Sequence, residues 1–194
     1  MYALAAIISY ILGSIPTAYL VVKWRTGKKV WEYGSKNVGT LNTYRVTGSV
    51  ILAILVLATD MLKAVLAYFI VKQLWPNALG IVPFFVVLGH NYPIWTRFRG
   101  GRGLAVFLTL ALLYQWNFVV AWALIWAITY ILSGYLAVAT VVTAVVTPIV
   151  LSIFGIPPVK ALIFAEIPLL LRYREKMVAL VAGQLKKHYW RETA

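Results

Sequence analysis

The chain contains no cysteine, and acidic residues are scarce. Disulfide bonds and thiolate chemistry are therefore excluded. Only five Asp and Glu are present among 194 residues, which leaves few carboxylates for metal-assisted hydrolysis. The motifs H-E-x-x-H, G-x-S-x-G, G-x-x-x-x-G-K-[ST] and the acyltransferase pattern H-x-x-x-x-D are also missing. We accordingly expect neither a bound metal nor a cofactor.

Apolar residues make up most of the sequence. Hydrophobic side chains account for 62% of the residues and charged ones for 12%, and the mean hydropathy is +0.86. A soluble domain of this size does not carry so much apolar sequence. Apolar runs of roughly 17 to 22 residues recur along the chain, which is about the length that a membrane-spanning helix needs. The predicted fold class is all-α: a polytopic integral membrane helical bundle forming one domain over residues 1–194.

The apolar runs predict about seven transmembrane helices. They cover residues 2–22, 49–71, 80–95, 104–114, 118–132, 135–154 and 159–171. The sequence Gly-Ser-Ile-Pro at residues 13–16 is expected to bend the first of these helices. A polar stretch occupies residues 23–48, and a basic tail begins at about residue 172. Residues 184–192 have the basic and aromatic composition of an interfacial membrane anchor.

Positive charge dominates the segments between the apolar runs. Eighteen Lys and Arg against five acids give a formal net charge of +13. In this setting the charge indicates anionic lipid headgroups and phosphorylated small molecules as partners, and no nucleic acid. With the N-terminus outside the cell, all Lys and Arg except Lys63, Lys72 and Lys160 fall on the inner side. This bias predicts a multi-pass membrane protein with its N-terminus outside and its C-terminus in the cytoplasm.

A glycine-rich, cationic loop within residues 89–105 is the first candidate functional segment. Its arginines and glycines are Arg97, Arg99, Gly100, Gly101, Arg102 and Gly103. Glycines allow several backbone N–H groups to approach one anion, and guanidinium groups can pair with two phosphate oxygens at once. The loop therefore predicts a phosphate site, although a basic turn that only orients the helices would have the same composition.

An earlier loop, residues 33–45, has matching chemistry. Its glycines, cations and hydrogen-bonding side chains are Gly34, Ser35, Lys36, Asn37, Gly39, Thr40, Asn42, Thr43 and Arg45. The charge bias puts both loops on the cytoplasmic side, where they can share one phosphate site. The alternative is a pair of solvated connectors.

Several ionisable residues lie within or beside the predicted helices. Asp60 and Lys63 share a helix face at a spacing of three residues, either as an ion pair that holds the helix or with Lys63 leaning toward the phosphate site. His90 could act as a general base or phosphate donor, or fill a polar niche. We assign no role to Glu166. Residues 172–176 (Arg-Tyr-Arg-Glu-Lys) are either a positive-inside signal or a third wall of the pocket.

Together these motifs resemble the bacterial acyl-phosphate-dependent glycerol-3-phosphate acyltransferases, the PlsY family. The family loop G-S-x-N-x-G-x-x-N with a later Arg is matched by Gly34, Ser35, Asn37, Gly39, Asn42 and Arg45. Its D-x-x-K motif is matched by Asp60 and Lys63. Its G-H-x-Y-P and F-x-G-G-[KR]-G motifs are matched by Gly89, His90, Tyr92, Pro93, Phe98, Gly100, Gly101, Arg102 and Gly103. The resemblance implies a seven-helix inner-membrane enzyme with its N-terminus outside.

The resemblance also implies a reaction: acyl transfer from acyl phosphate to the 1-hydroxyl of glycerol 3-phosphate, giving lysophosphatidic acid for phospholipid biosynthesis. Because phosphate leaves a mixed anhydride easily, the protein mainly has to position two anionic substrates and screen their repulsion. We expect catalytic roles for Ser35, Lys63, His90, Arg102 and Tyr173. We expect phosphate contacts from Asn37, Gly39, Asn42, Arg45, Arg99, Gly100, Gly101, Gly103 and Arg172. The proton acceptor could be His90, Tyr173 or a substrate phosphate oxygen.

The sequence departs from the family pattern at several positions, which indicates a divergent member. Lys36 stands where the family usually has Gly, and residues 40–41 are Thr-Leu where it has Ala-Thr. The phosphate-loop Lys is here Arg102. Near the C-terminus Tyr173 replaces the family's active-site His, and Lys176 replaces an Asn.

Two other functions fit the same residues. A paralogue that binds anionic lipid or phosphate without catalysis, or that uses another substrate, would account for the missing His. A transporter of organic phosphate is the other alternative. A transporter would place charges near mid-membrane on paired broken helices. The charges in this sequence are instead predicted to gather at one end of the helical bundle, so transport fits less well.

Overall fold

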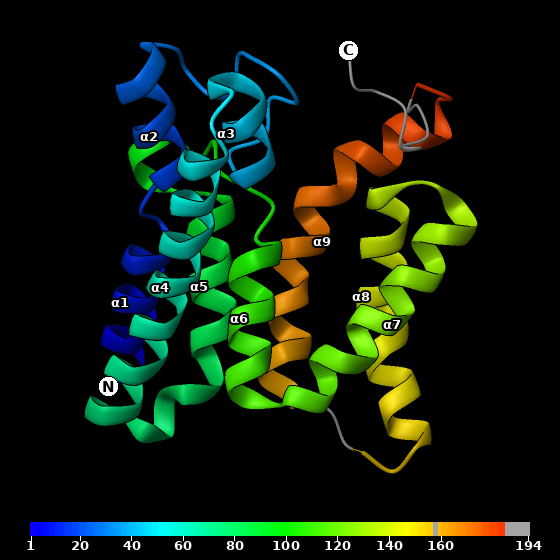
Figure 1. Cartoon of the computed structure of the whole chain (residues 1–194). Helices are drawn as coiled ribbons and strands as arrows, with labels where there is room; N and C mark the ends of the chain where they lie inside the picture. The colour runs from blue at the N-terminus through cyan, green and yellow to red at the C-terminus, as the bar shows by residue number, and fades with distance from the viewer. Residues whose placement is uncertain (157–158, 185–194) are drawn as a thin grey trace.

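The computed structural model describes residues 1–156 and 159–184, and in them it contains helices and connecting loops (Figure 1). The helices are α1 (Tyr2–Gly13), α2 (Thr17–Thr26), α3 (Thr40–Thr47), α4 (Val50–Leu74), η1 (Pro76–Ile81), α5 (Val82–Asn91), η2 (Ile94–Thr96), α6 (Leu104–Tyr114), α7 (Trp116–Ser133), α8 (Leu136–Ile153) and α9 (Lys160–Val181). The predicted all-α bundle is confirmed. The predicted anchor at residues 184–192 lies outside the described residues except for Gln184.

Local sequence explains where these helices begin and end. The bend expected at residues 13–16 is a complete break between α1 and α2, because Pro16 has no N–H with which to continue the hydrogen-bond pattern of α1. Gly134, at φ 76°, ends α7 in the left-handed conformation that glycine favours. The Ser49 hydroxyl caps α4 by accepting the Leu52 N–H at 3.3 Å.

Two predicted boundaries were wrong. No helix was predicted within the polar stretch 23–48, yet α3 lies there. The last helix was predicted to end at residue 171, but α9 continues to Val181. The charged residues after position 171 are good helix formers, so the loss of apolar sequence there does not end the helix. The basic segment from residue 172 is therefore helical as far as Val181.

The helices form a bundle with a hairpin beside it. In Figure 1, α1, α4, α5, α6 and α9 run alongside one another, and the α7–α8 hairpin stands next to α6 and α9. Glycines allow α1 and α5 to approach closely: a Cβ on Gly13 would overlap the backbone of Val86, and one on Gly89 would overlap the backbone of Tyr10. Such close approach through small residues is a common way to pack membrane helices.

Five helical segments of the described chain are long and apolar enough to cross a membrane: Tyr2–Thr26, Val50–Leu74, Pro76–Thr96, Trp116–Ser133 and Leu136–Ile153. The remaining two of the seven predicted spans correspond to α6 and α9. With 11 residues, α6 spans only about 16 Å. The charged second half of α9 lowers its hydropathy. Both nevertheless run through the bundle with the longer helices (Figure 1).

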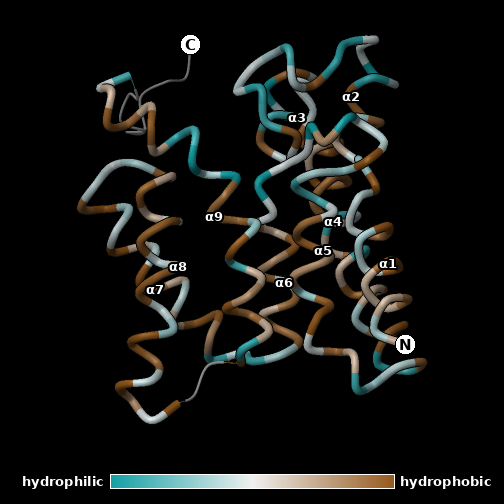
Figure 2. Tube along the Cα trace, turned by 180° about the vertical axis from the view of Figure 1, so that it is seen from behind, coloured by the Kyte–Doolittle hydropathy of each residue, from teal (hydrophilic) through white to brown (hydrophobic). Residues whose placement is uncertain are grey.

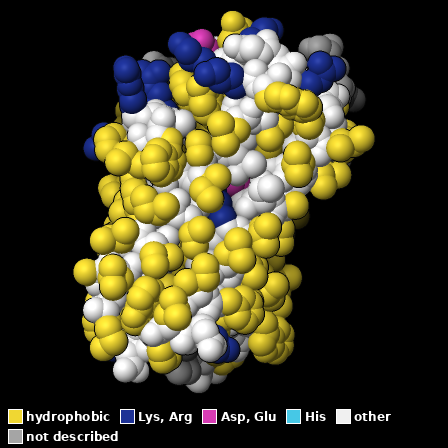
Figure 3. All heavy atoms as spheres, turned by 90° about the vertical axis from the view of Figure 1, so that its left-hand side faces the viewer, with side chains coloured by type: hydrophobic (Ala, Val, Ile, Leu, Met, Phe, Trp, Pro, Cys, Tyr) yellow, Lys and Arg dark blue, Asp and Glu magenta, His cyan; other side chains and the backbone are white. Residues whose placement is uncertain are grey.

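The charged and apolar surfaces are separated along the length of the bundle. Every described Lys and Arg except Lys63, Lys72 and Lys160 lies on α2, α3, the loops around them, the η2–α6 connection or the second half of α9. These segments meet at one end, which we term the basic end (Figure 1). Figure 2 shows hydrophobic residues along the flanks. In Figure 3 most of the visible Lys and Arg gather at the basic end above a hydrophobic flank.

We expect Gly89→Ala to lower the stability of the fold. The added methyl group has to displace the α1 backbone, and overpacking of this kind costs about 1–3 kcal/mol. Gly80→Ala is the matched control, because a Cβ there would meet nothing within 4 Å. Thermal unfolding of the purified variants in detergent should show a lower midpoint for Gly89→Ala only. Equal midpoints for the two variants would contradict the close packing of α1 on α5.

Candidate functional site

The loop before α3 is built around the buried side chain of Asn42. Its Oδ1 accepts the N–H of Ser35 at 2.7 Å, and its Nδ2 donates to Val30 O at 2.9 Å and Tyr33 O at 3.1 Å. The loop also turns through Gly34 at φ 59°. Asn42, which was predicted to contact phosphate, is thus committed to holding the loop that presents Ser35.

The first turn of α3 opens directly after this loop. Gly39 is extended, and no side chain caps the helix start. Uncapped N–H groups in a first helical turn favour an anion. Asn37, Gly39 and Thr40 line one of the cavities described below, so the start of α3 faces the same space as the loop.

The glycine loop, residues 97–103, is tightly packed and strained. Arg97 and Phe98 have φ values of 52° and 62°, which are costly for residues with a Cβ. A Cβ on Gly100 would overlap the His90 carbonyl, and one on Gly101 would overlap His90 Nε2. The Gly101 N–H already donates to His90 O at 3.1 Å. These glycines are required because the loop lies against the end of α5, and the Gly101 N–H has a partner within the protein.

Arg172, which lies on α9, forms hydrogen bonds to the glycine loop. Its Nε donates to Gly101 O at 3.2 Å and its Nη2 to Gly100 O at 3.0 Å, while the guanidinium lies 5.8 Å from the Tyr92 ring centroid. A guanidinium can satisfy two carbonyls at once because its donors are fixed in one plane. Arg172 was predicted to contact phosphate; in the structure it sets the position of the loop on α9.

Asp60, Lys63 and His90 form a polar cluster inside the bundle. Lys63 Nζ lies 2.8 Å from Asp60 Oδ1 and 2.9 Å from His90 Nδ1, and it donates to Ile15 O at 3.2 Å. Asp60 and Lys63 are only 3% and 4% exposed. The ion-pair interpretation of Asp60 and Lys63 is therefore confirmed. The same ammonium also reaches His90 and the break between α1 and α2.

The cluster determines how the His90 ring is oriented. An ammonium has three donors and no acceptor, so His90 Nδ1 has to accept from Lys63. A neutral ring then carries its proton on Nε2, the atom that faces Gly101. His90 is consequently arranged to donate a hydrogen bond on the side of the glycine loop.

Three neighbouring cavities lie at the basic end. The polar cavity, of about 140 Å³, is lined by Ser35, Asn37, Leu41, Asn42, Arg45, Arg102, Tyr135, Leu136, Ala137 and Lys176. The apolar groove, of about 410 Å³, is lined by residues 37–41, Leu57, Asp60, His90, residues 102–105, Trp126, Leu136, Thr140 and Tyr173. A third cavity of about 10 Å³ lies beside Lys63, His90, Gly100 and Gly101. The first two share Asn37, Leu41, Arg102 and Leu136.

Arg102 stands at the junction of the polar cavity and the apolar groove. Its guanidinium carbon lies 5.4 Å from the ring centroid of Tyr173, which is 4% exposed. A cation over an aromatic face is held electrostatically as well as by packing. Tyr173, which was predicted to be catalytic, makes a cation–π contact with Arg102 in this arrangement and so helps to position it.

The structure brings most of the predicted site residues together, and sets a few apart. Those that line the polar cavity or the apolar groove are Ser35, Asn37, Gly39, Asn42, Arg45, His90, Arg102, Gly103 and Tyr173. Lys63, Gly100 and Gly101 line only the small third cavity behind them. Arg99 is exposed and lies 5.9 Å from the Trp31 ring centroid, so it is directed away from the site. Within the described residues, no three His, Cys, Asp or Glu side chains gather as metal ligands do.

Several lining residues were not among the predicted site residues. Lys176, which the sequence placed only within a candidate third wall at residues 172–176, lines the polar cavity. Trp126, Leu136 and Thr140 line the apolar groove. Lys176 follows Arg172 by four residues, a spacing that would have put both on one helix face if α9 had been predicted to continue. The apolar lining residues carry no sequence signal that separates them from residues facing lipid.

We expect Asp60→Asn or Lys63→Met alone to destabilise the protein by about 3–5 kcal/mol, because each leaves a buried charge without its partner. The double variant should lose less than the sum of the two, since it removes both charges. Lys72→Met, an exposed position on the same helix, serves as control and should have little effect. Thermal unfolding measures all four proteins. Strictly additive losses would show that the two charges do not interact.

Comparison with known proteins adds an independent finding. A family model described as glycerol-3-phosphate acyltransferase matches residues 3–183. The glycerol-3-phosphate acyltransferase of Pelagibacter ubique is 36% identical over 128 residues, covering 63% of this chain and 65% of that protein. The corresponding protein of Agrobacterium fabrum is 38% identical over 126 residues, covering 64% and 61%. The matched region thus spans less than two thirds of the length of these relatives.

Solved structures extend the likeness over nearly the whole chain. The crystal structure of PlsY (YgiH), an integral membrane glycerol 3-phosphate acyltransferase, in its glycerol 3-phosphate form has a TM-score of 0.81 and 25% identity, covering 97% of this chain and 96% of that one. Its lysophosphatidic acid form has a TM-score of 0.78 and 25% identity, covering 96% and 94%. The shared fold is that of a multi-pass integral membrane protein.

Proposed function

The chain belongs to the glycerol-3-phosphate acyltransferase family, and on that premise we propose that it transfers a fatty acyl group from acyl phosphate to the 1-hydroxyl of glycerol 3-phosphate. The hydroxyl oxygen attacks the acyl carbonyl carbon, the bond from that carbon to the phosphate oxygen breaks, and the hydroxyl loses its proton. Lysophosphatidic acid and inorganic phosphate are the products. As catalyst, the protein positions two anions and stabilises the charge that develops on the carbonyl oxygen.

The observation that carries this proposal is the junction at Arg102. A cation-rich cavity suits a small phosphorylated molecule, and the adjoining groove between α4, α6 and the α7–α8 hairpin suits an acyl chain. The reaction has to bring a polar acceptor and a lipid-like donor together, so a site for it needs both environments side by side. Arg102 lines both and is placed to neutralise phosphate where the chain and the acceptor meet.

We assign a role to each of the other polar side chains according to whether its donors and acceptors already have hydrogen-bond partners within the protein. Ser35, Asn37, Arg45 and the first turn of α3 contact substrate phosphate. Asn42 and Arg172 hold the two loops in place, and Lys63 orients His90 without touching substrate. His90 donates from Nε2 and is not the proton acceptor, because its Nδ1 faces Lys63. The hydroxyl proton passes to a substrate phosphate oxygen, which the reaction brings to the same place.

The cavities lie at the basic end, and this supports a cytoplasmic site. Positively charged segments remain on the cytoplasmic side of inner-membrane proteins. An N-terminus outside and a C-terminus inside would then place the phosphate site where both substrates are made available from the cell interior.

The purified protein should make lysophosphatidic acid from palmitoyl phosphate and labelled glycerol 3-phosphate, and should do so in EDTA, because no step uses a metal. Arg102→Ala should lower kcat/KM by about 2–5 kcal/mol in transition-state free energy, since a charge-paired phosphate loses its partner.

Arg25→Ala is the matched control for this assay. Arg25 is an exposed arginine in the last turn of α2, away from the cavities, so its removal should leave the kinetics unchanged. Thin-layer separation of the labelled product measures all three proteins. No product from the wild type would refute acyl transfer, and unaltered kinetics in Arg102→Ala would remove the junction from the mechanism.

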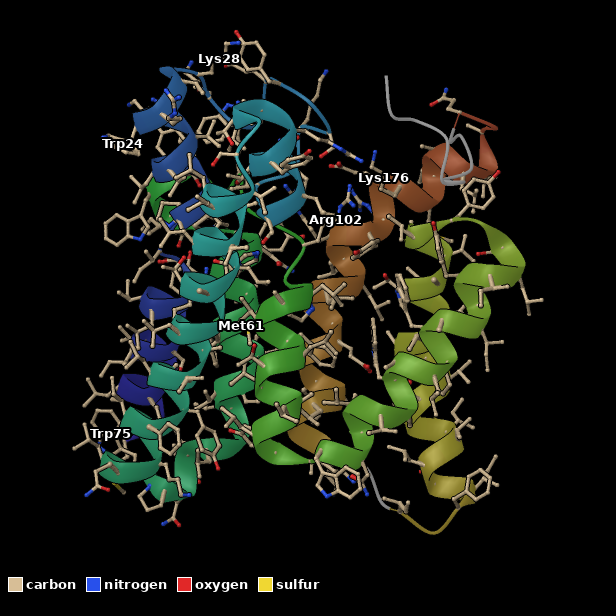
Figure 4. The ribbon with its side chains drawn as sticks, viewed as in Figure 1. Trp24, Lys28, Met61, Trp75, Arg102 and Lys176 are labelled. Carbon is tan, nitrogen blue, oxygen red and sulfur yellow. The ribbon has the colours of Figure 1, made fainter. Side chains whose placement is uncertain are left out.

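Single-cysteine labelling can test the orientation, because the natural chain has no cysteine to remove. Lys28→Cys places a thiol at the basic end, and Asn77→Cys places one in η1 next to Trp75, at the opposite end (Figure 4). A membrane-impermeant maleimide added to intact spheroplasts should label Asn77→Cys and reach Lys28→Cys only after lysis. The reverse pattern would place the site outside the cytoplasm.

A further inference from the structure

Lys176 belongs to the polar cavity although nothing in the proposed reaction has used it. It is half-buried on α9 and lines the cavity together with Ser35, Asn37, Arg45 and Arg102. Figure 4 shows the labelled Arg102 and Lys176 at the same end of the molecule, next to α9. Its neighbours in sequence, Arg174 and Glu175, are exposed and do not line the cavity. Of the charged residues at positions 174–176, only Lys176 faces the site.

The position of Lys176 is fixed by the same helix that holds the glycine loop. Arg172 is hydrogen-bonded to Gly100 O and Gly101 O, and Tyr173 packs against Arg102. Residues three and four positions apart lie on one face of a helix. Lys176 therefore lies one helical turn after Arg172, on the face of α9 that carries the other site residues.

The charge in the polar cavity is unbalanced. Three cations line it, Arg45, Arg102 and Lys176, and no Asp or Glu is among the lining residues. In the part of the chain that the structure describes, none of the three forms an ion pair. Like charges around a space of about 140 Å³ repel one another. An anion of more than one charge would offset that repulsion.

We propose that Lys176 is a third phosphate-binding cation and that its ligand is a doubly charged terminal phosphate group, carried either by a phosphate monoester or by an acyl phosphate. This assignment rests on the acyl transfer proposed above, in which both substrates carry such a group. Arg102 is held by the Tyr173 ring, whereas an ammonium on a flexible stem can follow the phosphate as a point charge. Lys176 thereby strengthens substrate binding without entering the chemical step.

Kinetics of Lys176→Gln, Lys176→Arg and Arg174→Gln test this role. The initial rate is measured as a function of glycerol 3-phosphate concentration at saturating palmitoyl phosphate. It is then measured as a function of palmitoyl phosphate concentration at saturating glycerol 3-phosphate. Lys176→Gln should raise the KM of one substrate about tenfold with kcat little changed, because one charge-assisted contact is lost. The substrate whose KM rises is the one whose phosphate lies against Lys176. Lys176→Arg should restore the KM to within about twofold of wild type, since it keeps the charge.

Arg174→Gln is the matched control, with the same helix and the same loss of charge outside the cavity. Its KM values should equal those of wild type. The tenfold effect of Lys176→Gln should also shrink at high salt, because a partly exposed charge is screened. Unchanged KM values in Lys176→Gln, or an equal effect in Arg174→Gln, would overturn the assignment.

A binding measurement separates this proposal from the reaction itself. Calorimetric titration with glycerol 3-phosphate and with inorganic phosphate reports affinity without turnover. Suppose that the wild type binds either molecule but makes no product, and that Lys176→Gln weakens the binding while Arg174→Gln does not. The phosphate site is then supported and acyl transfer is refuted. If neither molecule binds the wild type and no substrate KM depends on Lys176, the phosphate site itself is refuted.

Discussion

The contact between the glycine loop and the end of α5 determines the rest of the site. Gly100 and Gly101 lie so close to the backbone and ring of His90 that no side chain fits between them. Arg172 holds the opposite side of the loop through both glycine carbonyls. Because α5, the loop and α9 are fixed to one another in this way, Arg102 emerges at a single place, between the polar cavity and the apolar groove.

The buried cluster beneath the loop supports that contact from inside the membrane-spanning part. Lys63 satisfies its three donors with Asp60, His90 and the Ile15 carbonyl. A charge at this depth is expensive unless it is paired. Its partners come from α4, α5 and the break after α1, so the cluster ties these segments together. It also presents one defined edge of His90 to the loop. The break at Pro16 contributes because it leaves the Ile15 carbonyl between the two helices, where it accepts a hydrogen bond from Lys63.

The lack of acidic residues in the lining of the polar cavity gives the site its charge. Cations that line a cavity usually have carboxylates nearby, and here Arg45, Arg102 and Lys176 lack them among the lining residues. In the proposed acyl transfer the two phosphorylated reactants repel each other, so a site that joins them needs surplus positive charge. Tyr173 fits this arrangement, because an aromatic ring holds a cation in place without neutralising it.

The sequence alone determined the helical membrane architecture, the segregation of charge and the two loops that carry the site. Long apolar runs can only be helices in lipid, because the backbone has to satisfy its own hydrogen bonds there. The glycine and arginine spacing was enough to identify the two loops that line the cavities, and the Asp60–Lys63 pair followed from helix periodicity. These features are local, and local physics fixes them.

The tertiary structure decided which of those residues are free to face the cavities and which hold the loops in place. Asn42 and Arg172 had the composition of phosphate ligands, yet both donate hydrogen bonds that hold loops in place. Arg99 lies beside Trp31, outside the cavities, and Lys176 lines the polar cavity because α9 continues beyond residue 171. The direction of a side chain depends on contacts with residues that are distant in sequence, and the local spacing of residues does not identify those contacts.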